Sequence, residues 1–152
     1  MRTEGEAPPH LPDVSAEREV LETVLRMYEA MREKDPDRLI SVHSRSGYTL
    51  YNDAPPHDLL EGEMALRLKL SLMSQVQDLT YEVREQRVTV LGDFAVVTYE
   101  LEMSGVLVYS YRFEGSHWAR TARCTAVLRR EEGGWVIIHE HYSPAGPTRS
   151  TT

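Results

Sequence analysis

The order of the periodic segments most strongly limits what this chain can fold into. Residues 15–34 and 61–76 show the apolar spacing of amphipathic helices, whereas the C-terminal half consists of strand-like runs. The predicted long strands are Leu79–Leu91, Phe94–Tyr111, His117–Arg130 and Trp135–Ser143. Turn residues separate several of them, and strands joined by tight turns pair antiparallel. Helices followed by antiparallel strands predict an α+β fold, with the helices on one face of a curved sheet.

The helical segments carry start signals. Ser15 is a suitable N-cap for the first helix. Asp35 followed by proline is typical of a helix restart, because Asp caps a helix and Pro fits its first position. We therefore predict a short second helix over Pro36–His43, a short strand over 48–52, and a third helix over 61–76.

The length and the polar ends predict one domain. A chain of 152 residues, 41% of them hydrophobic, suits a single globular domain. Residues 1–14 and 145–152 are polar and proline-bearing, so we expect a disordered N-terminal arm and a flexible tail. The predicted domain, 15–144, encloses the remainder.

Charge and cysteine usage exclude several function classes. A net charge of −7 argues against binding to nucleic acid or to an anionic membrane. No apolar run is long enough for a membrane span, and the N-terminus has no secretory signal, so we expect a cytoplasmic protein. The single cysteine, Cys124, excludes an internal disulfide framework and a cysteine-based zinc site.

Strand alternation predicts a polar pair inside an apolar pocket. Side chains of a strand point alternately to its two faces. One face of the third long strand carries Trp118, Arg120 and Cys124 among alanines, and one face of the last strand carries Glu140 and Tyr142. We interpret these as inward faces, on which Glu140 pairs with Arg120 near aromatic rings. An apolar pocket with few convergent polar groups is typical of a small-molecule site.

The opposite face of the last strand predicts self-association. Trp135, Ile137, His139 and His141 share this face, with Arg123 on the neighbouring strand. Bulky apolar groups on the back of a sheet favour burial against a second subunit. We therefore expect a homodimer or a higher homo-oligomer with these residues at its interface.

Several local patterns are similar to a known superfamily. They are Tyr28–Asp35, Leu60–Gly62, Gly92–Tyr99, Arg123–Arg130 and Gly133–Ser143. Together with the element order, over Ala16–Pro144, they resemble the nuclear transport factor 2-like superfamily in its SnoaL-like branch. The closing strand also resembles the association (hub) domain of calcium/calmodulin-dependent kinase II. This fold hosts enzymes, ligand carriers and oligomerisation modules, so the resemblance specifies fold more than function.

The resemblance implies a cystatin-like cone. Three N-terminal helices would pack on a strongly curved, mainly antiparallel sheet, around a cavity open at one end, and members commonly dimerise through the sheet's convex face. Projected onto this sequence, the cavity would be lined by Met27, Met31, Tyr48, Leu50, Asn52, Tyr99, Leu101, Trp118, Arg120, Ala122, Cys124, Glu140 and Tyr142. His139 and His141 would lie on the opposite face.

Departures from two relatives narrow the chemistry. In ketosteroid isomerase an Asp ends the first strand as general base, where this chain has Asn52, with Asp53 one residue later. The oxyanion-stabilising acid and the helical Tyr of that enzyme correspond to Ala126 and Met27, so its mechanism is not supported. The hub domain has a basic pocket, but Tyr142 replaces one Arg, so Arg120 only partly supports anion binding.

Two main function hypotheses follow, beside a third in which the chain is a protein-interaction adaptor. The first is a SnoaL-like cavity protein for a small hydrophobic or aromatic molecule, acting without cofactor as an isomerase, a cyclase of the polyketide kind or a dehydratase. Glu140 would be its acid/base, while Arg120 and Asn52 would polarise a substrate oxygen. The alternative is a non-catalytic ligand-binding or hub-like oligomerisation module. The sequence leaves open whether the protein is an enzyme.

Each candidate residue also has a structural interpretation. Glu140 and Arg120 could form a structural ion pair, and Asn52, Asp53 and His57 could serve as turn residues. His139 and His141 share a strand face without an obvious third ligand, so we predict no metal site. Among the others, Tyr99, Trp118 and Tyr142 could stack on a ligand or fill the core, and Cys124 could be a small buried hydrophobe.

Overall fold

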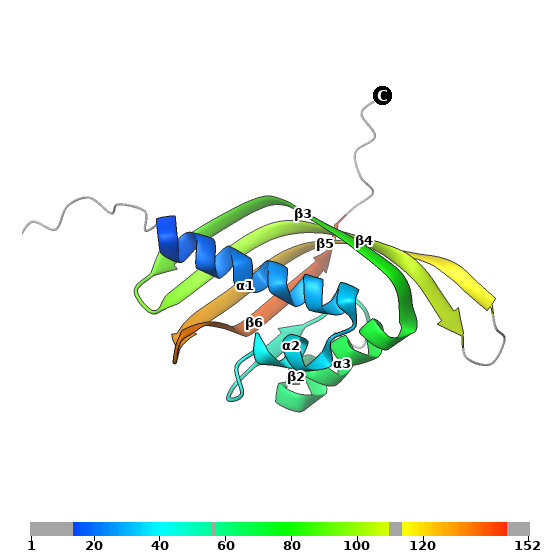
Figure 1. Ribbon diagram of the computed structural model, residues 1–152, viewed down its shortest axis with the longest axis horizontal. Coiled ribbons are helices and arrows are strands. Elements are labelled where there is room, and N and C mark those ends of the chain that lie inside the picture. The colour runs from blue at the N-terminus through cyan, green and yellow to red at the C-terminus, as the bar shows by residue number, and fades with distance from the viewer. Residues whose placement is uncertain (1–13, 56, 110–113, 146–152) are drawn as a thin grey trace, which may run out of the picture.

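The computed structural model describes residues 14–55, 57–109 and 114–145 (Figure 1). Its helices are α1 (Val14–Glu33), α2 (Pro36–Ser41) and α3 (Gly62–Gln75). Its strands are β1 (Thr49–Tyr51), β2 (Leu59–Glu61), β3 (Val76–Leu91), β4 (Phe94–Tyr109), β5 (Glu114–Glu131) and β6 (Gly134–Pro144). The α+β class predicted from the sequence is confirmed. The predicted arm and tail lie outside the described residues, apart from Val14, which begins α1, and Ala145.

The strands of the described residues form one mixed sheet in the order β2-β1-β6-β5-β4-β3. Neighbouring strands pair antiparallel except β1 and β6, which are parallel. In Figure 1, α1 lies along one face of the long strands, and α2 and α3 gather at the end occupied by β2. Strand β2 was not predicted. It forms because Leu60 pairs with Leu50 of β1, directly before α3 begins.

Helix α1 packs through a stripe that its sequence spacing predicts. Val20, Val24, Met27 and Met31 recur every three or four residues, and all are buried. The stripe faces the sheet, where α1 contacts β3, β4 and β6. Burying each such side chain contributes about 1.5–3 kcal/mol. The side chain of Asp35 accepts a hydrogen bond from the Arg38 amide and caps α2, as predicted.

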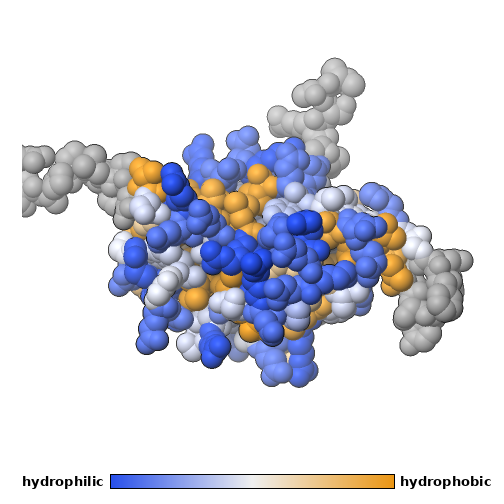
Figure 2. Space-filling model, in the orientation of Figure 1, coloured by the Kyte–Doolittle hydropathy of each residue, from blue (hydrophilic) through white to orange (hydrophobic). Residues whose placement is uncertain are grey.

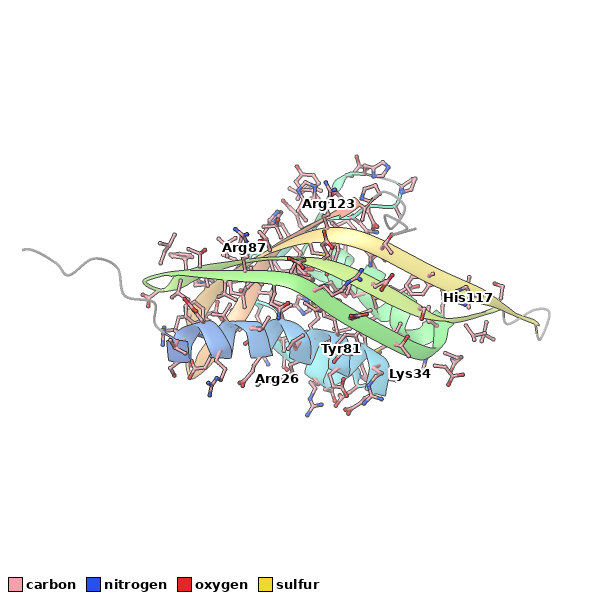
Figure 3. All side chains as sticks on the ribbon, turned by 90° about the horizontal axis from the view of Figure 1, so that it is seen from above. Arg26, Lys34, Tyr81, Arg87, His117 and Arg123 are labelled. Atoms are coloured by element: carbon pink, nitrogen blue, oxygen red, sulfur yellow. The ribbon has the colours of Figure 1, made fainter. Side chains whose placement is uncertain are left out.

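The sheet bends because β3 contains two irregularities. Its register with β4 shifts between Gln77 and Thr80 and again between Arg84 and Arg87. Asp78 and Glu85, within these bulges, have φ angles of 52° and 54°. Bulges increase local twist and curve a strand. Seen from above in Figure 3, the long strands curve over α1, which gives the concave face that carries the core.

The inward faces of β4 and β5 match the alternation predicted from the sequence. On β5, Ala122, Cys124, Ala126 and Leu128 are buried. On β4 the buried set is Ala95, Val97, Tyr99, Leu101 and Met103. Small β5 side chains lie beside larger β4 groups, since Ala122 pairs with Leu101 and Cys124 with Tyr99.

Strand β6 departs from the prediction. Its register with β5 slips at Val127/Leu128, which face His139 and Ile137, so Ile138 has no Cα partner. This bulge reverses the faces of the preceding residues, and Trp135 and Ile137 are buried at 5% and 0% exposure. The prediction that these two residues lie on the outer face is therefore wrong.

The start of β6 has a second partner that explains the bulge. Ile137 donates its backbone N–H to Val42 and accepts one from Ser44, so the segment after α2 pairs with it directly. Satisfying both neighbours holds Ile137 inward. Farther along β6, Glu140 and Tyr142 also point inward, as predicted, while His141 is exposed.

In the described part of the chain, no helix is long and apolar enough to cross a membrane. Polar residues dominate the face shown in Figure 2, where apolar side chains form separated spots.

Candidate functional site

A cavity of about 290 Å³ lies between the helices and the concave face of the sheet. This volume is at the small end of ligand sites. The helices contribute Tyr28, Met31, Leu68, Lys69 and Leu72, β1 and the following loop contribute Leu50, Asn52, Asp53 and Ala54, and the remaining strands contribute Met103, Trp118, Ala119, Arg120 and Tyr142. Most of this lining is apolar, and its charged and amide groups come from α3, from the loop after β1 and from β5.

Glu140 is a buried carboxylate with donors on both oxygens. Its side chain is 1% exposed. One oxygen, Oε1, accepts from the Tyr48 hydroxyl at 2.6 Å and from the Lys69 ammonium. The other, Oε2, accepts from the Tyr142 hydroxyl at 2.5 Å. These contacts satisfy the carboxylate as an anion.

Lys69 is the cation that balances Glu140. It lies on the buried side of α3, one turn from Ala65 and one turn from Met73. Besides its bond to Glu140, its Nζ donates to Nε2 of His43 at 2.8 Å and contacts the Met27 sulfur at 2.9 Å. An ammonium has three N–H groups, and all three have acceptors here.

His43 completes the cluster as a neutral ring. Its Nδ1 lies 2.7 Å from the Leu39 carbonyl, to which it donates, so Nε2 is the nitrogen that accepts from Lys69. The ring also stacks on Tyr48 with 4.5 Å between centroids. Burial and the adjacent Lys69 charge lower the pKa of His43, which favours the neutral form.

Burial disfavours the charged forms of Glu140 and Lys69, and the short distance between the two groups favours them. Burial alone would raise the pKa of Glu140, but the charge and the hydrogen bond of Lys69 hold that pKa well below its ordinary value. Burial lowers the pKa of Lys69, and the Glu140 charge counteracts this. Because all three of its N–H groups have acceptors, Lys69 is protonated, and it forms a buried ion pair with the Glu140 carboxylate.

A chain of tyrosine hydroxyls leads to the same carboxylate. Tyr142 donates to Glu140, so it accepts from Tyr28, whose hydroxyl lies 3.1 Å away. Tyr28 in turn accepts from Tyr99. Burial raises the pKa of all three phenols above the ordinary value, so each remains a donor. Hydrogen bonds aligned in one direction strengthen one another.

A second polar group lies at the cavity wall, on β5 and the loop after β1. Arg120 donates through Nη2 and Nε to both oxygens of Asp53, at 2.7 and 3.3 Å, and through Nη2 to Oδ1 of Asn52 at 2.9 Å. Its guanidinium lies 4.5 Å from the ring centroid of Tyr142. Although burial would lower the pKa of Arg120, the contacts with Asp53 raise it, so the guanidinium is charged.

A family comparison agrees with this architecture. The model of the SnoaL-like domain matches residues 20–147, which is most of the chain. The chain belongs to the SnoaL-like domain family. The resemblance predicted from the sequence is therefore confirmed. No curated protein matches this SnoaL-like chain.

Solved structures share the fold of this SnoaL-like domain. A proposed dehydratase of the nuclear transport factor 2-like family from Streptomyces avermitilis has a TM-score of 0.74 at 21% identity, covering 88% of this chain and 98% of that chain. A proposed calcium/calmodulin-dependent protein kinase II association domain from Xanthomonas campestris has a TM-score of 0.70 at 17% identity, covering 97% and 100%. A nuclear transport factor 2-like protein from Salmonella enterica has a TM-score of 0.74 at 19% identity, covering 92% and 98%. Identities this low show the fold alone.

The predicted pairing of Glu140 with Arg120 is wrong. In this SnoaL-like domain Glu140 pairs with Lys69, and Arg120 pairs with Asp53. Tyr142 lies between the two groups, because its hydroxyl contacts Glu140 while its ring stacks under Arg120. Two separate ion pairs therefore replace the single predicted one.

The predicted cavity residues of the SnoaL-like domain divide into two layers. Met31, Leu50, Asn52, Trp118, Arg120 and Tyr142 line the cavity. Met27, Tyr48, Tyr99, Leu101, Ala122, Cys124 and Glu140 are buried and do not belong to its lining. Glu140 thus reaches the cavity only through Lys69 and Tyr142, both of which line it.

Two residues of the cluster were missed in the sequence. Lys69 shares a helical face with Ala65 and Met73, so a charge on a buried stripe was the available signal. His43 gave no signal, because it lies at the end of a short helix in a polar stretch. Both residues join the cluster through contacts with Glu140, which is far away in sequence.

Three of the residues predicted for an interface lie on the outer face of the sheet. His141 is exposed, Arg123 is exposed and His139 is half-buried, with Nδ1 of His139 2.7 Å from the Thr49 hydroxyl. The ring of Tyr51 lies 5.4 Å from that of His141. Among residues 14–55, 57–109 and 114–145, no three potential metal ligands cluster. Burial raises the pKa of the Cys124 thiol to about 12, which disfavours a reactive thiolate.

Proposed function

We propose that this SnoaL-like domain binds a small hydrophobic or aromatic molecule in its cavity and transfers a proton on that molecule without a cofactor. The observation that carries the proposal is the convergence of Arg120, Asn52 and Asp53 on an otherwise mainly apolar cavity. Such a lining excludes most water and leaves a few polar groups to orient a ligand. The reaction class would be isomerisation, cyclisation or dehydration.

The proposal gives each polar group a role. Arg120 and Asn52 polarise an oxygen of the ligand, which makes a neighbouring C–H more acidic. Asp53 is the carboxylate in the cavity lining and accepts the proton. Arg120 holds both oxygens of Asp53, which orients the carboxylate toward the site.

Glu140 takes a different role from the acid/base that the sequence suggested. Unlike Asp53, it does not belong to the cavity lining, and its lowered pKa keeps it ionised. It therefore positions Lys69 and Tyr142 in the cavity wall instead of exchanging protons with a ligand.

Hydrogen–deuterium exchange tests the proton transfer. The protein is incubated in D₂O with 2-tetralone, a bicyclic ketone, and exchange of its α-hydrogens is followed by NMR. We expect exchange above the buffer rate, and a loss of about 100-fold or more in Asp53→Asn, as for removal of a general base. Glu82→Gln, on the outer face, is the control. Wild-type exchange at the buffer rate with the ketone bound would contradict catalysis.

A non-catalytic, self-associating module is the second candidate. The outer face carries Tyr51, Arg123, His139 and His141, and the solved relatives include kinase association domains. We propose a homodimer formed through this face. Sedimentation should give a dimer that His141→Glu weakens, and a wild-type monomer would contradict it. The cytoplasmic location expected from the sequence also remains a proposal.

A further inference from the structure

The donors at the Arg120 side of the cavity are not all used. Nη1 of Arg120 and the side-chain nitrogen Nδ2 of Asn52 have no hydrogen-bond partner within the described ranges. Among the described residues, the unpaired side-chain polar atoms that are fully enclosed by protein are Arg84 Nε and Trp135 Nε1, so Nη1 and Nδ2 remain accessible. Both groups line the cavity, so they are available to an acceptor placed inside it.

The donors on the other side of the cavity are occupied. Lys69 uses its three N–H groups on Glu140, His43 and Met27. The hydroxyl of Tyr142 donates to Glu140 and accepts from Tyr28. A ligand therefore finds its polar contacts at Arg120 and Asn52 and meets mainly apolar surface elsewhere.

The charges around the cavity cancel. Lys69 balances Glu140, Arg120 balances Asp53, and His43 is neutral because it accepts from Lys69. A charged ligand would enter this cavity without a counter-ion, which costs far more than burying a neutral group that is hydrogen-bonded.

We propose that the cavity selects a small neutral molecule with a carbonyl-type oxygen over an anion of the same shape. The oxygen accepts from Nη1 of Arg120 and from the amide of Asn52, and the apolar body packs against Leu68, Leu72 and Trp118. This inference rests on the proposed ligand-binding function and adds the ligand class to it.

Three probes of nearly equal shape test the proposal: ethylbenzene without an oxygen, acetophenone with a neutral carbonyl, and benzoate with an anionic group. Binding is followed by NMR through the indole N–H of Trp118, which lines the cavity, with buried Trp135 as the reference. We expect acetophenone to bind about tenfold more tightly than either other probe, as one or two net hydrogen bonds allow.

Two variants locate the selectivity. Asn52→Asp keeps an acceptor for Arg120 but removes the amide donor, so it should reduce the preference for acetophenone over ethylbenzene to less than about threefold. Leu68→Trp narrows the cavity and should weaken all three probes together. Benzoate binding as tightly as acetophenone would overturn the inference while leaving the binding function intact. Absence of binding by every probe would overturn the proposed function and the inference with it.

Discussion

Lys69 of α3 and Glu140 of β6 form a salt bridge in the core, although they lie 71 residues apart in sequence. Their side chains are 7% and 1% exposed. The pair joins the third helix to the last strand directly beside the cavity, because Lys69 is also part of the cavity lining. It therefore links the stability of the fold to the shape of the candidate site.

Removing the cation should destabilise the protein strongly. Lys69→Met leaves Glu140 buried without its counter-charge, and we expect a loss of about 3–5 kcal/mol in the free energy of unfolding. Urea titration followed by circular dichroism measures it. Arg67→Met on the same helix is the matched control, since the Arg67–Glu63 pair is exposed and should change stability by less than about 0.5 kcal/mol.

The double variant separates charge burial from packing. Lys69→Met combined with Glu140→Gln should be more stable than Lys69→Met alone, because no unpaired charge remains. A double variant as unstable as the sum of the single variants would contradict the ion-pair interpretation.

Acidification should destabilise the fold in two steps. The pKa of His43 is lowered by burial, so the unfolded chain takes up its proton first, and stability falls as pH drops below the ordinary value of 6.5. The pKa of Glu140 is also lowered, so its contribution is present above 4.5 and is lost as pH falls toward its folded value. Unfolding free energies at pH 7.5, 5.5 and 4 measure both steps. His43→Gln should flatten the first step, and an unchanged slope in this variant would contradict the assignment.

The phase of β6 predicts a large effect at Trp135 and a small one at His141. Trp135→Ala should cost about 3–5 kcal/mol, because the ring is buried and Arg130 stacks on it. His141→Ala, on the exposed face, should change the stability of the protein by less than about 0.5 kcal/mol. Thermal unfolding measures the stability of both variants. A loss at Trp135 as small as that at His141 would contradict the inward orientation of Trp135.

Cys124 should be inert in the folded protein. The thiol is buried and its pKa is raised to about 12, so little thiolate exists at pH 8. Alkylation by iodoacetamide, read by mass spectrometry, should be slow in buffer and complete in denaturant. Rapid native alkylation would indicate that this region opens readily.

Changing the charge of the cavity should change its ligand preference. Asp53→Asn leaves Arg120 without a carboxylate and gives the cavity a net positive charge. We expect benzoate to bind about tenfold more tightly than to the wild type, while acetophenone changes little. Titration of both ligands into both proteins provides the measurement, and equal benzoate affinities would argue against the charge balance.

Local signals in the chain predicted most of the fold. The helix spacing around Val24, the Asp35 cap and the alternation on β4 and β5 each depend on residues close together in sequence. Arg120, Asn52 and Tyr142 line the cavity, where the family resemblance had projected them. Period-two alternation suffices for these strands because the pairing of β4 with β5 continues without a register shift.

The amino-acid order alone therefore specified the element types, their succession and the inward faces of the continuous strands, since these depend on short-range periodicity. Folding in three dimensions set the phase of β6 and the partners of the buried charges. The bulge near Ile138 reflects simultaneous pairing with β5 and the segment after α2, and Lys69 meets Glu140 only when α3 packs onto the sheet. Such long-range contacts follow from which surfaces the whole chain can bury together, and no local pattern encodes them.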